Sequence, residues 1–215
     1  MPSGPFPGIS GPVYPATTGG TPTIHDLGFG PSDTARVERL IRSIKPSSPL
    51  VGLGERILAL GQQFGVDPLL IAQWQLESGM ATVGANSPGN GGNMIWAAAK
   101  PYAPEYGCTS GEAFGGARWA HCPTVEGGLG IWFRYVGDFY PPRAKTLDEY
   151  ARIYNPCSDP GNIALGLPCG DRYAALLLGL VREHAGPPAE AHPHVLRCPL
   201  VSAHRHCLLP MPKRI

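Results

Sequence analysis

The segment that decides the fold reads GVDPLLIAQWQLESG and covers residues 65–79. Asp67 can accept a hydrogen bond at the start of a helix, and Pro68 suits the first helical turn, where no backbone donor is needed. The apolar residues that follow are spaced for a buried face, and Gly79 is a stop signal. The segment therefore predicts a packed helix that runs from Asp67 to about Glu77.

Glu77 lies near the end of this predicted helix and shares a face with Leu70, Gln73 and Trp74. Apolar neighbours remove hydration from a carboxyl group, which disfavours its charged form and raises its pKa. A raised pKa lets a carboxylic acid hold its proton near neutral pH, as an acid catalyst must. The alternative is a solvated glutamate at a helix end, which the helix pattern alone favours because most glutamates are surface residues.

Helical patterns continue on both sides of this segment. Apolar spacing and end signals predict further helices over residues 34–44, 52–64, 124–139, 146–154 and 171–184. We expect Asp33, Thr124, Thr146 and Asp171 to cap the starts of four of them. The chain is therefore predicted to be mostly helical.

Residues 79–123 have a different composition, rich in glycine, asparagine, proline and aromatic residues. They predict a loop, a short helical turn near residues 95–99 and a hairpin near residues 108–122. The expected fold class is mostly α (α+β), with a helical body and a small loop and β-hairpin lobe. A cleft between body and lobe would suit a long polymeric substrate.

The chain divides into three expected parts. Residues 1–31 form an arm rich in proline and glycine, residues 32–186 form the folded domain, and residues 187–215 form an irregular basic tail. The whole chain has 215 residues, with 29 glycines and 25 prolines, which predicts many loops. The oligomeric state is left open.

Several partners and cofactors are not expected from the sequence. The formal net charge is +1 and no basic block indicates a nucleic-acid groove, so no nucleic-acid partner is predicted. The sequence contains no apolar run of about 18 residues, so we predict no membrane span. No secretory signal is evident at the N-terminus. Phosphate-binding, dinucleotide-binding and zinc-protease motifs are missing from the sequence, so we expect no cofactor and no metal.

The six cysteines fall into local pairs and predict disulfides. The expected pairs are Cys108–Cys122, Cys157–Cys169 and Cys198–Cys207. Disulfides would place the working protein outside a reducing cytosol. The alternatives are free thiols or, in the tail, a metal site that combines Cys198 and Cys207 with His204 and His206.

Three stretches carry a resemblance to a known family: residues 65–79, the run NGGNMIW at residues 90–96, and YARIYNP at residues 150–156 followed by Tyr173. Together they resemble the glucosaminidase family of peptidoglycan hydrolases, which are flagellar-type muramidases with a lysozyme-like fold. The resemblance covers about residues 50–185. It departs from the family at Ala97, where a glycine is expected, and in the cysteines, which are not a usual family feature.

The resemblance implies roles for particular acids. Glu77 matches the glutamate of the family motif Ala-Gln-x-x-x-Glu-Ser-Gly and would be the general acid. An inverting glycosidase also needs a base about 6.5–9.5 Å from the acid. The family places this second carboxylate in the hairpin lobe, where Glu112 stands, with Glu105 and Glu126 as rivals. Without a second acid, the enzyme would instead be a lytic transglycosylase, in which a hydroxyl of the substrate attacks and Glu77 serves as both base and acid.

The resemblance also indicates residues that line the cleft. Tyr154 is expected near the catalytic acid, and Asn93, Trp96, Trp119 and Asn155 are expected to bind sugar. Each has a structural alternative, since a tyrosine near a helix end usually packs in a core and an asparagine can cap a turn. Two further tryptophans lie on helical stripes and are predicted to be core residues, namely Trp74 and Trp132.

The function expected from these observations is cleavage of the β-1,4 glycosidic bonds of bacterial cell-wall glycan. Which of the two alternating bonds is cut stays open, so the activity could be that of an N-acetylglucosaminidase or of a muramidase. The competing hypothesis is a protein that keeps the fold and binds glycan without cutting it. The expected location is extracellular, periplasmic or virion-associated, because of the predicted disulfides.

Overall fold

The computed structural model describes residues 27–84, 88–114, 117–140, 143–159, 163, 166 and 168–187. Most of this part is helical and it contains a single two-stranded sheet, so the expected mostly-α class is confirmed. The long helices are α1 (Thr34–Ile44), α2 (Gly54–Phe64), α5 (Val125–Phe139), α6 (Leu147–Tyr154) and α8 (Asp171–His184). The short elements are η1 (Pro68–Ala72), α3 (Gln73–Ser78), α4 (Trp96–Ala99), η2 (Ala103–Tyr106), β1 (Thr109–Phe114) and β2 (Ala117–His121).

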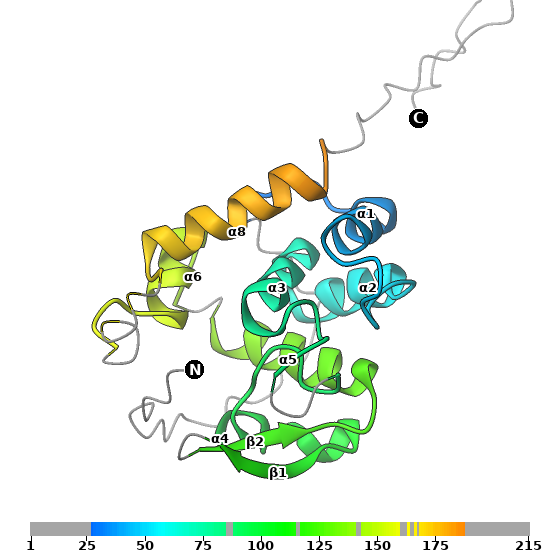
Figure 1. Cartoon of the computed structure of the whole chain (residues 1–215), viewed down its shortest axis with the longest axis vertical. Helices are drawn as coiled ribbons and strands as arrows, with labels where there is room; N and C mark the ends of the chain where they lie inside the picture. The colour runs from blue at the N-terminus through cyan, green and yellow to red at the C-terminus, as the bar shows by residue number, and fades with distance from the viewer. Residues whose placement is uncertain are drawn as a thin grey trace, which may run out of the picture.

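Figure 1 shows how these elements are arranged. Helix α8 crosses one end of the molecule beside α1, helices α3 and α5 lie in the middle, and the hairpin with α4 lies at the opposite end. Residues 198 and 207, the third predicted cysteine pair, lie outside the described residues. Among the residues that are described, each helix is too short or too polar to cross a bilayer.

The decisive segment forms two short helices instead of the single predicted helix. Asp67 caps its start as expected, because its carboxylate accepts a hydrogen bond from the Leu69 N–H at 3.0 Å. The chain then winds as the 3₁₀ helix η1 and becomes α-helical only at Gln73. All residues of η1 are buried, so packing sets the tighter winding of this stretch. Gly79 ends α3 in the left-handed conformation, with φ of 55°.

Side-chain caps begin three of the five long helices, namely α1, α5 and α6. Asp33, Thr124 and Thr146 each accept a backbone N–H of their own helix, as predicted. The prediction for Asp171 is wrong. Gly170 occupies the cap position, and because glycine has no side chain, α8 starts without a side-chain cap. The Asp171 carboxylate instead pairs with Arg152 of α6 at 2.7 Å.

The folded body begins before the predicted boundary at residue 32. Phe29 is only 4% exposed and belongs to the hydrophobic core, and Leu27 packs against that core. The carbonyl of Pro31 accepts a hydrogen bond from the buried Arg36 side chain at 2.7 Å. The burial of Phe29 and the hydrogen bond at Pro31 attach the last residues of the expected arm to the domain.

Helix α5 runs through the centre of the core and carries Trp132. The rings of Trp132 and Trp74 meet edge to face with their centroids 5.9 Å apart, and both residues are fully buried, as predicted. Glycines in α5 allow close approach of other segments. A Cβ atom at Gly128 would stand 2.2 Å from the Gly89 carbonyl oxygen, so a side chain there would separate α5 from the loop over it.

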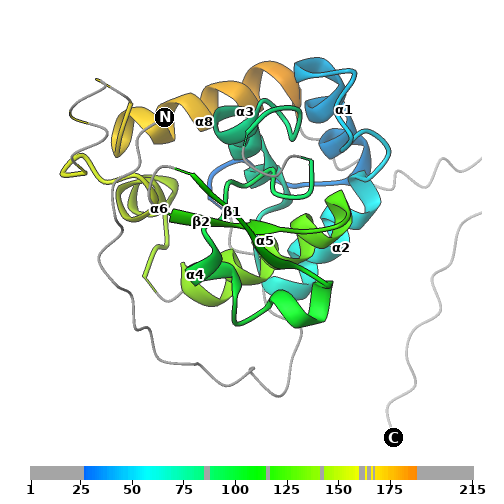
Figure 2. The same ribbon diagram turned by 60° about the horizontal axis from the view of Figure 1, so that its bottom comes forward.

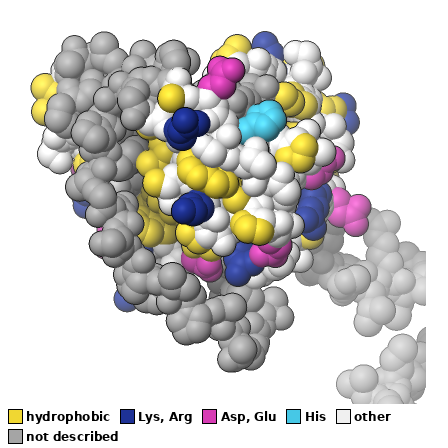
Figure 3. All heavy atoms as spheres, turned by 90° about the horizontal axis from the view of Figure 1, so that it is seen from below, with side chains coloured by type: hydrophobic (Ala, Val, Ile, Leu, Met, Phe, Trp, Pro, Cys, Tyr) yellow, Lys and Arg dark blue, Asp and Glu magenta, His cyan; other side chains and the backbone are white. Residues whose placement is uncertain are grey.

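The predicted hairpin is present and is joined to the segment before α4. Strands β1 and β2 pair antiparallel, with an irregularity in register between Ser110 and Ala113. The predicted Cys108–Cys122 disulfide closes the base of the hairpin, and Trp119 forms a bridge with Ile95 just before α4. Figure 2 shows the hairpin and α4 on the same side of α5. On the face seen from below, apolar side chains gather beside basic ones (Figure 3).

Candidate active site

Glu77 lies in the last turn of α3, one residue before the buried Ser78 and two before the left-handed Gly79. The residue as a whole is half-buried. Its carboxyl group faces two tyrosines that come from distant parts of the chain. The hydroxyl of Tyr173, in the first turn of α8, donates a hydrogen bond to Glu77 Oε1 at 2.8 Å. The hydroxyl of Tyr154, the last residue of α6, also interacts with this carboxyl.

Burial raises the pKa of Glu77 above the ordinary glutamate value. Hydrogen bonds from Tyr173, Tyr154 and Asn93 act in the opposite direction, because each donor stabilises the charged carboxylate. Burial is the largest of these effects, so the group retains its proton to higher pH than a solvated glutamate does. This environment differs from the solvated helix end that was the alternative interpretation.

The tyrosines around Glu77 form a stack. The rings of Tyr150 and Tyr154, one helical turn apart on α6, lie 5.8 Å apart and nearly parallel. Tyr173 also stacks on Tyr154, with the ring centroids 5.8 Å apart. The Tyr150 hydroxyl donates to Oε1 of Gln73, which precedes Glu77 by one turn of α3. Two residues of α3 are therefore held by the hydroxyl groups of one aromatic stack.

Asn93 reaches the site from the glycine-rich loop. Its side-chain amide donates to the backbone carbonyl of Glu77, and its backbone is left-handed, with φ of 48°. The loop is closed by Asn90, whose side chain bonds both the N–H and the carbonyl of Met94 at 2.8 and 3.0 Å. A Cβ atom at Gly91 would stand 2.1 Å from the Trp74 ring. The loop lies flat on the core only because glycine occupies that position.

The turn directly after Glu77 has an uncommon backbone. Gly79, Met80 and Ala81 all have positive φ, at 55°, 58° and 64°. The side chains of Met80 and Ala81 are buried. Ser78 Oγ accepts the Ala81 N–H at 3.0 Å, and Ser48 Oγ donates to the Met80 carbonyl at 2.7 Å. Such backbone strain persists only when the surroundings impose it, and it is concentrated at functional sites.

Three buried polar atoms near Glu77 have no hydrogen-bond partner within the described residues. They are Gln73 Nε2, Trp74 Nε1 and Asn93 Oδ1. A buried polar atom without a partner carries a desolvation penalty, so native structures contain few of them. Two of the three belong to Gln73 and Asn93, which bond Tyr150 and Glu77, and their position favours a functional origin for this part of the molecule.

The residues predicted to act beside Glu77 occupy different places. Glu112 lies on β1 of the hairpin, as predicted, and is exposed. Its rivals have structural roles, since Glu105 pairs with Arg134 and Glu126 lies in the first turn of α5. The side-chain amide of Asn155 donates to the Pro168 carbonyl at 2.8 Å, which makes it part of the connection between α6 and α8.

The two tryptophans predicted to bind sugar, Trp96 and Trp119, are both half-buried in the hairpin lobe and its attachment to the body. Trp96 packs against the core from α4, so part of its ring surface is already occupied. The predicted disulfide between Cys157 and Cys169 is present, as is Cys108–Cys122. No group of three metal-ligating side chains occurs among the described residues, and the cysteines and histidines of the tail fall outside them.

Sequence reasoning gave no direct role to Tyr173, Tyr150 or Gln73. Spacing contained part of the signal, because Gln73 and Glu77 are four residues apart on one helix and Tyr150 and Tyr154 are four apart on another. The contact between Tyr173 and Glu77 spans 96 residues of sequence and follows from the packing of α8 across the body.

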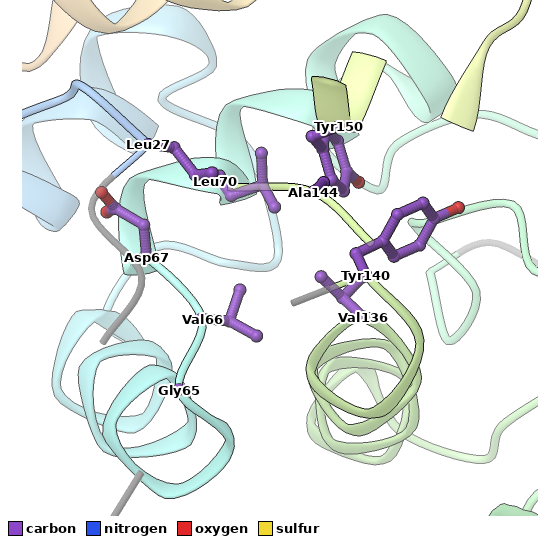
Figure 4. A pocket seen from close by; sticks show the side chains of 9 residues that line it. All are labelled: Leu27, Gly65, Val66, Asp67, Leu70, Val136, Tyr140, Ala144 and Tyr150. Carbon is purple, nitrogen blue, oxygen red and sulfur yellow. The ribbon is translucent and has the colours of Figure 1, made fainter. Parts of the chain in front are cut away.

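A small cavity lies behind the stack, between η1, α5 and the start of α6 (Figure 4). Its volume is about 20 Å³, room for about one water molecule. Tyr140, Tyr150 and Leu70 are among the residues that line it, and the only charged one, Asp67, already binds Ser32 and Leu69. It is a packing defect of the core and is too small for a sugar ring.

Comparisons of the chain with protein-family models, with curated proteins and with solved structures find no match. The family resemblance therefore rests on the three stretches of sequence given above.

Proposed function

We propose that this protein cleaves the β-1,4 glycosidic bonds of bacterial cell-wall glycan, with Glu77 as the general acid. The observation that carries the proposal is the environment of the Glu77 carboxyl, which is buried beside Tyr154 and Tyr173 and has a raised pKa. A carboxyl that holds its proton near neutral pH can protonate the oxygen of a leaving sugar. The mostly helical fold with a hairpin lobe is consistent with this function and does not establish it.

The opposing influences on the Glu77 pKa suit an acid that must give up its proton. Burial favours the protonated form before the reaction. Once the proton has passed to the glycosidic oxygen, the carboxylate that remains is stabilised by donors already in place, the hydroxyls of Tyr154 and Tyr173 and the amide of Asn93. Because these donors need no rearrangement, they stabilise the charge as it develops.

We assign the second carboxylate to Glu112. In this role it would activate the attacking water from the hairpin, on the face of the sugar opposite Glu77. Asn93 and Asn155 would hydrogen-bond the sugar and its acetamido group, and Trp96 and Trp119 would stack on sugar rings. The two disulfides are compatible with work outside the cell, in the periplasm or on a virion.

One observation favours a second candidate, the lytic transglycosylase. The side-chain groups that bond the Glu77 carboxyl are hydroxyls and an amide, and Glu112 is an exposed side chain of the hairpin. A lytic transglycosylase needs a single glutamate, which first protonates the leaving oxygen and then accepts a proton from the attacking hydroxyl of the substrate.

Digestion of purified cell-wall glycan tests the proposal. Wild type is compared with Glu77→Gln and with Glu55→Gln, a matched change at an exposed glutamate in the first turn of α2. We expect wild type and Glu55→Gln to clear the glycan and Glu77→Gln to fail. Equal clearing by all three proteins, or by none, contradicts the enzymatic proposal, and glycan binding without clearing supports a binding protein. Mass spectrometry of the products separates the two enzymes, because only a transglycosylase leaves anhydro-sugar ends.

A further inference from the structure

The two tyrosines that contact Glu77 come from the facing ends of two helices. Tyr154 is the last residue of α6 and Tyr173 is the third residue of α8. Helices α6 and α8 pack against each other, and the two rings stack with an interplanar angle of 28°. Any change in the distance between these helix ends therefore moves both hydroxyl groups relative to the carboxyl.

Three separate links hold the helix ends together, and we call them the α6–α8 clamp. The Cys157–Cys169 disulfide is the covalent link. The second link is the ion pair between Arg152 Nε and Asp171 Oδ1, at 2.7 Å. In the third, Asn155 donates its side-chain amide to the Pro168 carbonyl at 2.8 Å and accepts the Gly170 N–H at 2.9 Å through its own carbonyl. All three lie within five residues of Tyr154 or Tyr173.

The covalent link is the most important of the three. The Arg152–Asp171 pair is exposed on both sides, at 58% and 66%, so water screens it and it contributes little to stability. A disulfide constrains the chain more strongly than such a pair does. The sulfur of Cys157 also lies close beside Gly170, the residue at the start of α8, where an added Cβ would stand 3.3 Å from it.

The two disulfides of the described chain differ in their access to solvent. Cys108 and Cys122 are buried, at 6% and 3% exposure. Cys157 is exposed and Cys169 is half-buried. A soluble thiol can therefore attack the clamp disulfide while the hairpin disulfide stays protected.

We propose that the Cys157–Cys169 disulfide is a positioning element of the active site, which holds Tyr154 and Tyr173 on Glu77 so that turnover requires this disulfide to be oxidised. The proposal rests on the proposed function. A dithiol reductant opens the link by thiol–disulfide exchange. It transfers two electrons and two protons, becomes a cyclic disulfide, and leaves two cysteine thiols on the protein. The site would then be inactive in a reducing compartment and become active where disulfides form.

Turnover of cell-wall glycan tests the first part of this proposal. The double variant Cys157→Ser/Cys169→Ser is compared with Cys198→Ser/Cys207→Ser, the same chemical change at the predicted pair in the tail. We expect kcat of the clamp variant to fall between about tenfold and about a hundredfold, the effect of a small displacement of catalytic groups, while the tail variant matches wild type. Dithiothreitol should lower the kcat of wild type to that of the clamp variant and leave the kcat of that variant unchanged. Reoxidation should restore the kcat of wild type.

A second measurement separates positioning from general stability and needs no substrate. The titration of the Glu77 carboxyl is followed by carbon NMR with and without Tyr173→Phe, in the oxidised protein and in the clamp variant. If the clamp places the hydroxyl, Tyr173→Phe shifts the titration midpoint in the oxidised protein and shifts it less than half as much in the clamp variant. Should the clamp variant fail to fold, the same comparison is made before and after reduction, with alkylation identifying the reduced cysteines.

The outcomes separate the two proposals. Unchanged turnover in the clamp variant, together with equal Tyr173→Phe shifts in both backgrounds, overturns the clamp. A lack of wall-cleaving activity in wild type, with unequal shifts, overturns the proposed function and supports the clamp as the element that positions these tyrosines.

Discussion

Glu77 and Glu112 are both acids of the predicted site, and the structure gives them opposite surroundings. Glu77 ends a helix in the centre of the body, where burial raises its pKa and tyrosines from α6 and α8 hold its carboxyl. Glu112 lies on an outer hairpin and is exposed to solvent. The difference teaches that burial and neighbouring hydroxyl groups can shift the pKa of one acid, while a second acid proposed for the same reaction lies on the solvent-exposed surface. The predictions below test this division of roles.

The largest effect is expected from Glu77→Gln. Glutamine cannot donate a proton to the leaving oxygen, so kcat should fall by about 10²–10⁴-fold, the usual contribution of general acid catalysis. The measurement is the rate of release of reducing ends from cell-wall glycan, with Glu55→Gln as the control. A loss below tenfold would remove Glu77 from the role of acid.

Glu112→Gln is expected to have the second largest effect. If Glu112 activates water, the variant should lose up to about a hundredfold in kcat, and its residual products should be those of hydrolysis. Glu105→Gln, at the rival position on η2, should retain wild-type turnover and is the matched control. Wild-type activity in Glu112→Gln, with anhydro-sugar products, would transfer the assignment to the single-acid transglycosylase.

Tyr173→Phe is expected to move the pH profile without abolishing activity. The hydroxyl lowers the pKa of Glu77 by stabilising the carboxylate, so its removal raises that pKa further. A general acid loses activity as pH rises through its pKa, and the alkaline limb of kcat should therefore move to higher pH. If the alkaline limb of the kcat profile stays in place or moves to lower pH, the Tyr173 hydroxyl does not lower the pKa of the catalytic acid.

The smallest expected effect is on stability. A carboxyl whose pKa is higher in the folded protein than in the unfolded chain binds more protons when folded, so it contributes stability at low pH that is lost as pH rises through the folded pKa. Glu77→Gln removes this dependence. The variant should therefore melt a few degrees above wild type at neutral pH by calorimetry, and the advantage should shrink in acid. Equal melting temperatures of Glu77→Gln and wild type at both pH values would contradict this prediction.

The sequence predicted most of the helices because their signals are local. Asp33, Thr124 and Thr146 cap the helices that they were expected to cap. Trp74 and Trp132 lie in the core on the stripes that predicted them. The error at residues 68–72 has a different origin, since a fully buried stretch takes the winding that its neighbours impose, and periodicity does not report those neighbours.

The candidate site was predictable only in part for the same reason. Glu77 was found from a local motif, but the burial that raises its pKa comes from the packing of the whole body, and the Tyr173 hydroxyl that bonds its carboxyl is 96 residues away in sequence. Asp171 resembles a helix cap and instead binds Arg152, because the packing of α6 beside α8 offers it a charged partner. Contacts between distant segments decide both cases, and a single sequence carries no direct signal for them.

The left-handed turn after Glu77 has a consequence for the handedness of the chain. Gly79, Met80 and Ala81 follow the mirror image of the usual helical path, and an L-residue in that region loses about 1–2 kcal/mol. A D-alanine introduced at position 81 by chemical ligation would fit this path without that penalty. The twenty encoded residues include no D-residue, so the encoded chain carries this cost at two buried residues, Met80 and Ala81, directly behind the acid.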